Sequence, residues 1–237
     1  MKTKFLELWI LNCVFMLASA PAIAAEQVSA VKLVYQEFEE NVEPYRVTYT
    51  VANKYLRIDD GSDNSGHIVF DIKANKIFSI SHLDKSILVI PEHPAVEFKP
   101  DFNIDVVYKP MTGAPEISGK QVYNYRVKAL IGVTSETCMD IQLVPELLPK
   151  VANALQSFQK IISGQHVSNL EKTPEEFRTP CYLVDLVYNK GDYYSKGLPV
   201  IEWHSNGKIR QLVNFEEAEI DASMFSIPAE YRQYSLQ

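Results

Sequence analysis

The chain has 237 residues, of which 46% are hydrophobic and 22% are charged, and its net charge is −7. These values describe an ordinary globular protein that is long enough to bury one sizeable core. The acidic balance and the lack of any basic run argue against a nucleic-acid partner, because binding phosphates needs clustered Lys and Arg.

The N-terminal segment has the three-part pattern of a signal peptide. Lys2 and Lys4 precede an apolar run, and Ala22 and Ala24 stand at the −3 and −1 positions of a cleavage site. A membrane anchor needs about 20 apolar residues, and this run is shorter. The pattern predicts a signal peptide over residues 1–24 and a single exported domain over residues 25–237. The mature protein is therefore expected to be periplasmic or secreted, without an integral membrane span.

Export changes how the cysteines are interpreted. After cleavage only Cys138 and Cys181 remain, an even number in an oxidising compartment. We expect a structural disulfide between them. Two buried free thiols and a redox-active pair are the alternatives, although the Cys-x-x-Cys spacing of most redox pairs is absent.

The first half of the mature chain consists of short β-rich runs separated by turn residues. Apolar and polar residues alternate over 45–51, which indicates a strand with one buried face. The other runs with strand character in this half are 31–38, 55–59, 67–72, 76–82 and 86–90. The breaks between the runs from 45 onward are short enough for hairpins, so the pattern predicts a curved antiparallel meander.

The middle of the chain is less regular. Five prolines between 91 and 115 make long elements improbable there, and we expect a wandering connection with a short extended piece at 104–108. Strand character returns at 119–129 and continues through 134–141.

One amphipathic helix is predicted over residues 147–162. Pro149 suits its first turn, where the missing N–H costs nothing, and Gly164 is expected to end it. Its apolar residues recur at intervals of three and four and form one stripe that needs a partner surface. They are Leu148, Val151, Leu155, Phe158 and Ile162.

Strands are expected again after a polar loop, at 182–188, 198–204 and 208–215. Asn206-Gly207 between the last two is a strong hairpin signal. The tail at 221–231 has apolar residues that need burial and is expected to be an ordered arm. The predicted fold class is α+β, mainly β: a curved antiparallel sheet, or half-barrel, covered by one main amphipathic helix.

Several of these stretches together resemble a known group of proteins. They are Lys54 to Asp59, Ile68 to Asp71 with Lys76-Ile77, Lys85 to Val89, Gly119 to Val127, Gly197 to Val200, and Phe225 with Pro228 and Tyr231. They resemble small exported bacterial proteins of unknown function that are similar to the lipoprotein-carrier half-barrels of the LolA/LolB kind. The resemblance implies an unclosed barrel around helical cover, with a cavity for acyl chains.

No catalytic, cofactor or metal motif is found. The five histidines show neither an H-x-x-x-H pair nor zinc-ligand spacing with a cysteine, and we interpret them as surface or turn residues. A nucleophile elbow and phosphate-binding glycine loops are also absent. Aromatic residues are common in packed sheets, and among them Trp203, beside the Asn206-Gly207 hairpin, stands out as a possible carbohydrate contact.

The leading hypothesis is an exported, non-enzymatic binding protein that holds a lipid, another apolar ligand or a lipidated partner between sheet and helix. A cell-envelope interaction module with a filled core is the alternative. A hydrolase assembled from distant residues is a weaker one. The sequence predicts no cofactor and leaves the ligand and the oligomeric state open.

Overall fold

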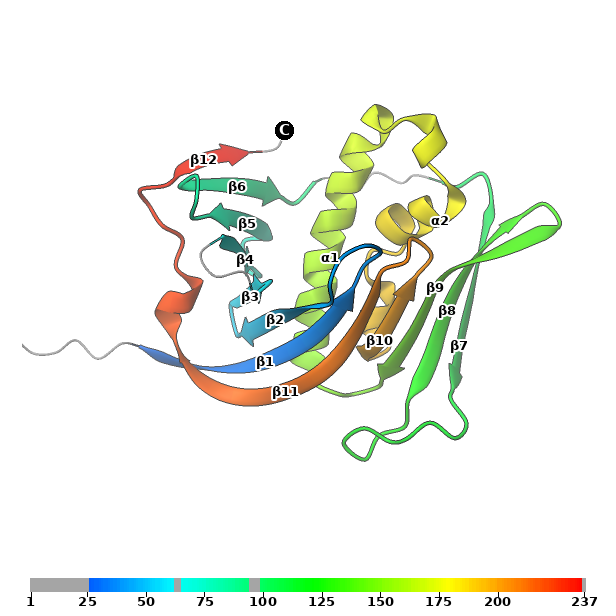
Figure 1. Ribbon diagram of the computed structural model, residues 1–237, viewed down its shortest axis with the longest axis horizontal. Helices are drawn as coiled ribbons and strands as arrows, with labels where there is room; N and C mark the ends of the chain where they lie inside the picture. The colour runs from blue at the N-terminus through cyan, green and yellow to red at the C-terminus, as the bar shows by residue number, and fades with distance from the viewer. Residues whose placement is uncertain (1–25, 62–64, 94–98, 236–237) are drawn as a thin grey trace, which may run out of the picture.

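The computed structural model describes residues 26–61, 65–93 and 99–235. The predicted signal peptide lies outside these ranges. Twelve strands of the described chain form one sheet that curves around a long helix, α1 (Pro149–Asn169) (Figure 1). Among the described residues, no helix has the length and apolarity needed to cross a membrane.

The first six strands lie in consecutive order in the sheet, and the five from residue 45 onward form the meander that the sequence predicts. The six strands are β1 (Gln27–Phe38), β2 (Tyr45–Ala52), β3 (Tyr55–Asp59), β4 (Gly66–Asp71), β5 (Lys76–Ser81) and β6 (Ser86–Pro91). Each pairs antiparallel with the next. The alternation along β2 buries Val47, Tyr49 and Val51 in the core on the concave face.

The other half of the sheet is built from later strands. They are β7 (Asn103–Pro110), β8 (Tyr123–Ile131), β9 (Thr134–Val144), β10 (Leu198–His204) and β11 (Ile209–Asp221). Pairing of β11 with β1 joins the two halves, and β7 and β12 (Arg232–Ser235) are the two edges of an open sheet. The proline-rich stretch thus contains an eight-residue edge strand, longer than predicted. Pro110 is tolerated at its end because an edge strand need not donate every N–H.

Helical structure is more extensive than the sequence pattern predicts. Gly164 does not end α1, which continues to Asn169, and Ser163 and Gln165 on either side of it are buried. Residues 182–188 are not a strand but belong to α2 (Pro180–Leu183) and a π-helical turn, η3 (Val184–Tyr188). Thr179 caps α2 by accepting a hydrogen bond from the Tyr182 N–H, and Pro180 fits the first turn. Short 3₁₀ turns are η1 (Leu170–Lys172), η2 (Glu175–Phe177), η4 (Asp192–Ser195) and η5 (Ala222–Phe225).

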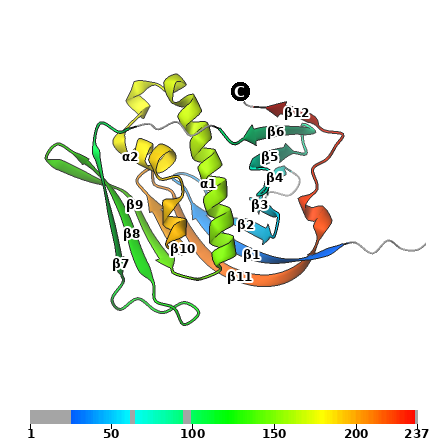
Figure 2. The same cartoon turned by 180° about the vertical axis from the view of Figure 1, so that it is seen from behind.

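The concave face of the sheet packs against α1, which crosses the open side (Figure 2). Val151 and Leu155 are buried, whereas Leu148, Phe158 and Ile162 are half-buried and pack on the same core. The ring of Phe158 lies edge-on to that of Phe70 on β4, with 5.9 Å between centroids. One stripe of the helix therefore faces the sheet, as expected of an amphipathic helix.

The disulfide between Cys138 and Cys181 is confirmed. Cys138 lies in β9 and Cys181 in α2, so the bridge attaches α2 to the sheet. It does not fasten α1 directly. In turn, α1 contacts both η3 and η4, which places the residues after the bridge between α1 and strands β8 to β10.

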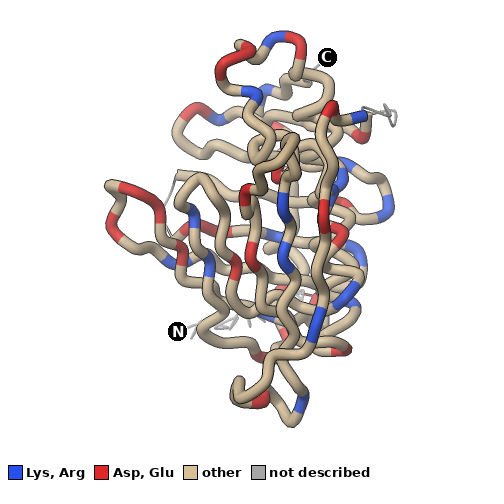
Figure 3. Tube along the Cα trace, turned by 90° about the vertical axis from the view of Figure 1, so that its right-hand side faces the viewer, with Lys and Arg blue, Asp and Glu red and all other residues tan. Residues whose placement is uncertain are grey.

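The C-terminal segment covers the convex face of the first half of the sheet. Phe225 is buried and stacks on Tyr55, and Ile227 and Tyr231 pack over a second buried cluster on β4 to β6. The segment ends in β12, which pairs with β6 in parallel and is the exception to the antiparallel pattern. Over the other half of the sheet, acidic and basic residues are interspersed without a large basic area (Figure 3).

Candidate functional site

A pocket of about 270 Å³ lies between α1 and the β10–β11 hairpin, and we call it the concave pocket. Its two walls differ in chemistry. One wall is apolar and comes from Leu155, Phe158 and Ile162 of α1 and Leu186 of η3. The other is polar and comes from Asp185 of η3, Glu202 and His204 of β10, Lys208 just before β11, and Arg210 of β11. Because Asn206 at the hairpin is exposed and Glu202 is buried, the pocket runs from the surface inward to the sheet.

The floor of the concave pocket is a buried ion pair between Glu202 and Arg210. The Asn206-Gly207 hairpin sets the register that places Glu202 opposite Arg210. The exposed fraction of Glu202 is 2%, and its carboxylate accepts a hydrogen bond from Nη2 of Arg210. The guanidinium also donates to the hydroxyls of Tyr49 and Tyr194, each over 2.8 Å. Further hydrogen bonds make a buried charge pair tolerable; here they engage Nη1 and Nη2 of Arg210, while its Nε is buried without a partner among the described residues.

Aromatic rings hold the Arg210 guanidinium from the sheet side. Its central carbon lies 4.7 Å from the ring centroid of Tyr35 and 5.4 Å from that of Tyr49. These are cation–π distances. Tyr35 is fixed in turn by donating a hydrogen bond to the carbonyl of Pro199 over 2.9 Å. Burial lowers the pKa of Arg210, but Glu202 together with Tyr194, Tyr49 and Tyr35 outweighs burial, and the pKa rises well above its ordinary value.

His204 is clamped between two carboxylates at the other side of the pocket. Its Nδ1 lies 3.0 Å from an oxygen of Asp185, and its Nε2 lies 3.5 Å from Glu202. Burial lowers the pKa of His204, but the hydrogen bonds to Asp185 and Glu202 outweigh it and raise the pKa to about 9. Burial likewise raises the pKa of Glu202, but Arg210 and His204 outweigh it and lower the pKa to about 2. His204 and Glu202 are therefore both charged at neutral pH.

A second charged cluster lies at the rim, between the hairpin and β1. Lys208 Nζ lies 2.8 Å from Glu37 and 3.4 Å from Glu39. Tyr45 donates to Glu39 over 2.7 Å. Burial lowers the pKa of Lys208, but the hydrogen bond to Glu37 and the nearby negative charges outweigh it and raise the pKa. The charged groups of the polar wall thus form two clusters, in each of which every cation lies next to at least one carboxylate.

The interpretation of every histidine as a surface or turn residue is wrong for His204, whose side chain is 12% exposed and paired with two acids. The sequence does carry a signal for the site. Alternate residues of the predicted strand lie on one face, and that face carries Leu198, Val200, Glu202 and His204. A charged residue therefore stood on the buried face. Its partner Arg210 could not be assigned, because pairing depends on the register of the hairpin.

Metal binding finds no support in the described ranges: no group of three or more His, Cys, Asp or Glu side chains there is arranged to hold an ion. Among the residues that line the concave pocket there is also no Ser, Thr or Cys. The charged groups on the polar wall have protein partners. This arrangement can recognise a polar group by hydrogen bonding, with little charge to neutralise.

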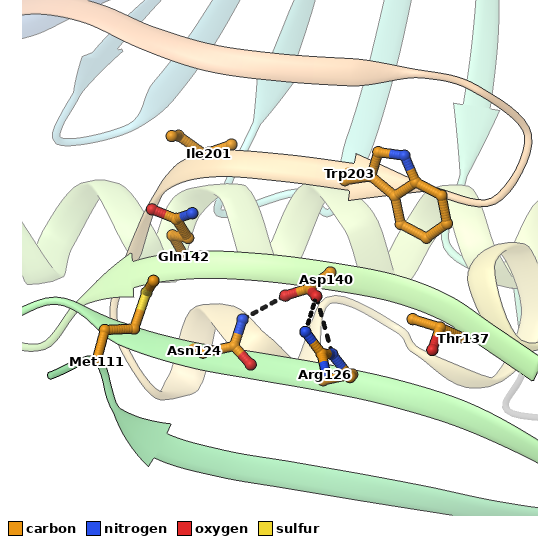
Figure 4. Close-up of a pocket in the computed structure, with 8 residues that line it drawn as sticks. All are labelled: Met111, Asn124, Arg126, Thr137, Asp140, Gln142, Ile201 and Trp203. Atoms are coloured by element: carbon orange, nitrogen blue, oxygen red, sulfur yellow. Dashed lines mark hydrogen bonds and ion pairs between the residues drawn. The ribbon is translucent and has the colours of Figure 1, made fainter. Parts of the chain in front are cut away.

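A second hollow of about 550 Å³ lies on the convex face over β8, β9 and β10 (Figure 4). We call it the convex groove. It is lined by Asn124, Arg126, Asp140, Gln142, Ile201 and Trp203, with Met111 and Thr137 at its ends. The sheet separates it from the concave pocket, because successive residues of a strand point to opposite faces.

No protein-family sequence model matches the chain, and no curated protein sequence matches it. Two solved structures of PNGF-II, in space groups C2 and P21, are similar to 88% of the chain with TM-scores of 0.37 and 0.38 and 9% sequence identity. The similar part is 31% and 32% of those chains, so this protein spans about a third of their length. Similarity at this level assigns neither a fold family nor an activity.

Proposed function

We propose that this protein is a non-enzymatic binding protein that holds a small amphipathic molecule in the concave pocket. The observation that carries the proposal is the contrast between the two walls, Leu155, Phe158 and Ile162 on one side and Glu202, His204 and Arg210 on the other. A ligand with an apolar body and a polar head satisfies both walls at once. Small-molecule sites combine apolar surface with a few fixed polar groups in this way.

The volume of the concave pocket limits the size of the ligand. At about 270 Å³ it lies just below the range of about 300–1,000 Å³ that is usual for small-molecule sites. A lipid with two acyl chains does not fit inside it, whereas a single-chain amphiphile or the end of one acyl chain does. The resemblance to lipoprotein-carrier half-barrels favours such a chain, delivered by a lipid or a lipidated protein.

The pKa values of the polar wall favour binding over catalysis. A general acid or base works best with a pKa near the ambient pH. The pKa of His204 is raised to about 9 and that of Glu202 is lowered to about 2. Both groups keep their charge near neutral pH and serve as fixed hydrogen-bonding partners. The same reasoning applies to Arg210, whose pKa is raised further.

We place the protein outside the cytoplasm in this proposal. The support is the signal-peptide pattern ending at Ala24 and the disulfide, which is stable in an oxidising compartment. A fusion of residues 1–24 to a reporter that is active only in the periplasm tests this part independently of ligand binding.

Anilinonaphthalene sulfonate, an amphiphile whose fluorescence rises in apolar surroundings, tests the pocket. We expect a saturable rise with the folded protein, and displacement of the probe by lauric acid. Ile162→Phe narrows the pocket and should weaken probe binding roughly tenfold, about 1.4 kcal/mol. Ile131→Phe adds the same bulk at an exposed position outside the pocket and should leave binding unchanged. Equal probe binding by both variants, or none by the wild type, would contradict the proposal.

A further inference from the structure

The convex groove has a regular layout that the proposed function does not use. Two rows of side chains cross the three strands, as the register of β8, β9 and β10 dictates. One row is Arg126, Asp140 and Trp203, and the other is Asn124, Gln142 and Ile201. Neighbouring strands are about 4.8 Å apart and alternate residues about 7 Å apart, so the rows span an area of roughly 10 by 7 Å. That area matches one or two sugar rings.

The polar side chains in the groove are fixed before any ligand arrives. Asp140 accepts hydrogen bonds from Nδ2 of Asn124 and from Nε and Nη2 of Arg126, the Nε bond over 2.8 Å. Figure 4 shows both side chains converging on the Asp140 carboxylate from the neighbouring strand. Because these rotamers are already set on a rigid sheet, little conformational entropy is lost on binding.

Trp203 supplies an aromatic wall next to this polar network. Its exposed fraction is 37%, and in Figure 4 its indole lies at the same end of the groove as Arg126 and Asp140. Tryptophan combines a large apolar ring face with one N–H donor. Within the part of the chain that the structure describes, no side-chain hydrogen bond engages the indole of Trp203 or the amide of Gln142, so both remain available to a ligand.

Saccharides have the surface that this layout complements. A sugar ring presents a face of C–H groups, which packs on an indole, and hydroxyls that both donate and accept hydrogen bonds. Amide groups such as those of Asn124 and Gln142 also donate and accept. An anionic ligand is disfavoured, because Asp140 neutralises Arg126 and the chain carries a net charge of −7. An apolar ligand would leave the hydrogen-bonding side chains of the groove without partners.

We propose that the convex groove binds a neutral saccharide, with Trp203 stacked on a sugar ring and Asn124, Asp140 and Gln142 bonded to its hydroxyls. This inference is independent of the concave pocket, since the two sites lie on opposite faces of the sheet.

The chain provides its own probe for this proposal. Its two tryptophans are Trp9 and Trp203, and protein produced from Ala25 onward keeps Trp203 alone. Titration with maltotriose and, separately, with triacetylchitotriose should change the tryptophan emission saturably at millimolar concentrations for at least one of the two. The indole N–H resonance in the NMR spectrum should shift with the same midpoint. No change with either saccharide would overturn the proposal.

Variants then place the site, with affinity measured by isothermal titration calorimetry. Trp203→Ala should weaken binding at least tenfold and Gln142→Ala about threefold, while Phe177→Ala, an exposed aromatic residue on η2, should bind as the wild type does. Unfolding curves check that each variant is folded. If Trp203→Ala is unfolded, the affinity of Gln142→Ala and the shift of the wild-type indole resonance decide whether the saccharide binds in the convex groove. Saccharide binding that survives in folded Trp203→Ala would overturn the assignment.

Discussion

His204 Nδ1 lies 3.0 Å from a carboxylate oxygen of Asp185, so a histidine at the end of β10 is tied to the π-helical turn η3 across the concave pocket. Cys181 ties the preceding helix, α2, to β9. The residues after α1 are therefore attached to the sheet at two points, one covalent and one ionic. Together, the disulfide and the ion pair hold one side of the concave pocket in place.

The ionic attachment makes stability depend on pH in a definite direction. The pKa of His204 is raised on folding from its ordinary value of 6.5 to about 9. A raised pKa means that its contribution to the free energy of unfolding is complete below about pH 6.5 and is lost as the pH rises through 9. We expect the midpoint of thermal unfolding to fall over this interval, by the equivalent of about 3 kcal/mol. His204→Gln should be less stable at pH 6 and should lose this slope.

His93→Gln is the matched control for the pH experiment. His93 is hydrogen-bonded to the Gln165 amide rather than to an acid, so its replacement should leave the slope above pH 7 as in the wild type. A wild-type midpoint that stays constant from pH 6.5 to 9 would contradict the role given to His204.

The buried pair Glu202–Arg210 predicts a large and non-additive effect on stability. Arg210→Met leaves the Glu202 carboxylate buried without its main partner, which typically costs about 3–5 kcal/mol. Arg210→Met with Glu202→Gln removes both charges and should cost clearly less than the sum of the single changes. Urea unfolding at pH 7 of Arg210→Met, Glu202→Gln and the double variant measures these losses.

Arg126→Met is the control. It breaks the more exposed pair with Asp140 and should cost about 0–1 kcal/mol. Equal losses for the two arginine variants would refute the distinction.

How far the sequence could predict this site is seen in Glu202 and Arg210. Strand periodicity predicted β10 and the hairpin that follows it, because local alternation and an Asn-Gly turn are written in neighbouring residues. The pair itself also depends on which residues face each other across the hairpin and on which face α1 covers. The only local indication of the pair was a charged residue, Glu202, among the alternate residues of 198–204 that face the core. Tyr35 and Tyr49 come from distant parts of the chain and left no such local indication.

The errors in helix prediction have a similar cause. Gly164 reads locally as a helix end, yet the helix continues because its last turns are anchored by tertiary contacts, among them the 2.7 Å hydrogen bond between His93 and Gln165. The apolar run at 182–188 reads as a strand. However, Thr179 and Pro180 start a helix there, and Leu183, Val184 and Val187 are buried at helical spacing.

Removing the disulfide should destabilise the protein and loosen one region first. The bridge spans a sequence separation of 43 residues, for which the chain-entropy estimate is about 4 kcal/mol. We expect the Cys138→Ala, Cys181→Ala double variant to lose about 2–4 kcal/mol in urea unfolding. Hydrogen exchange should accelerate most in residues 180–195. The meander of β2 to β6 is remote from the bridge and is the internal control. Uniform acceleration over both regions would contradict a local role.

Backbone proximity at Gly197 predicts that a single added methyl group there is damaging. Gly197 precedes β10 with φ +155°, and a Cβ there would lie 2.4 Å from the carbonyl oxygen of Val144 at the end of β9. Backbone atoms cannot yield as a flexible side chain does, so Gly197→Ala should displace β10 and cost about 3 kcal/mol or more. Gly207→Ala also has positive φ but meets nothing within 4 Å, and it should cost about 1 kcal/mol. Urea unfolding of the two variants distinguishes the cost of a collision with the backbone from the cost of the positive φ alone.

Gly197→Ala should also affect the concave pocket, because β10 carries Glu202 and His204. Under conditions where Gly197→Ala remains folded, it should bind the fluorescent probe more weakly than the wild type, while Gly207→Ala should not.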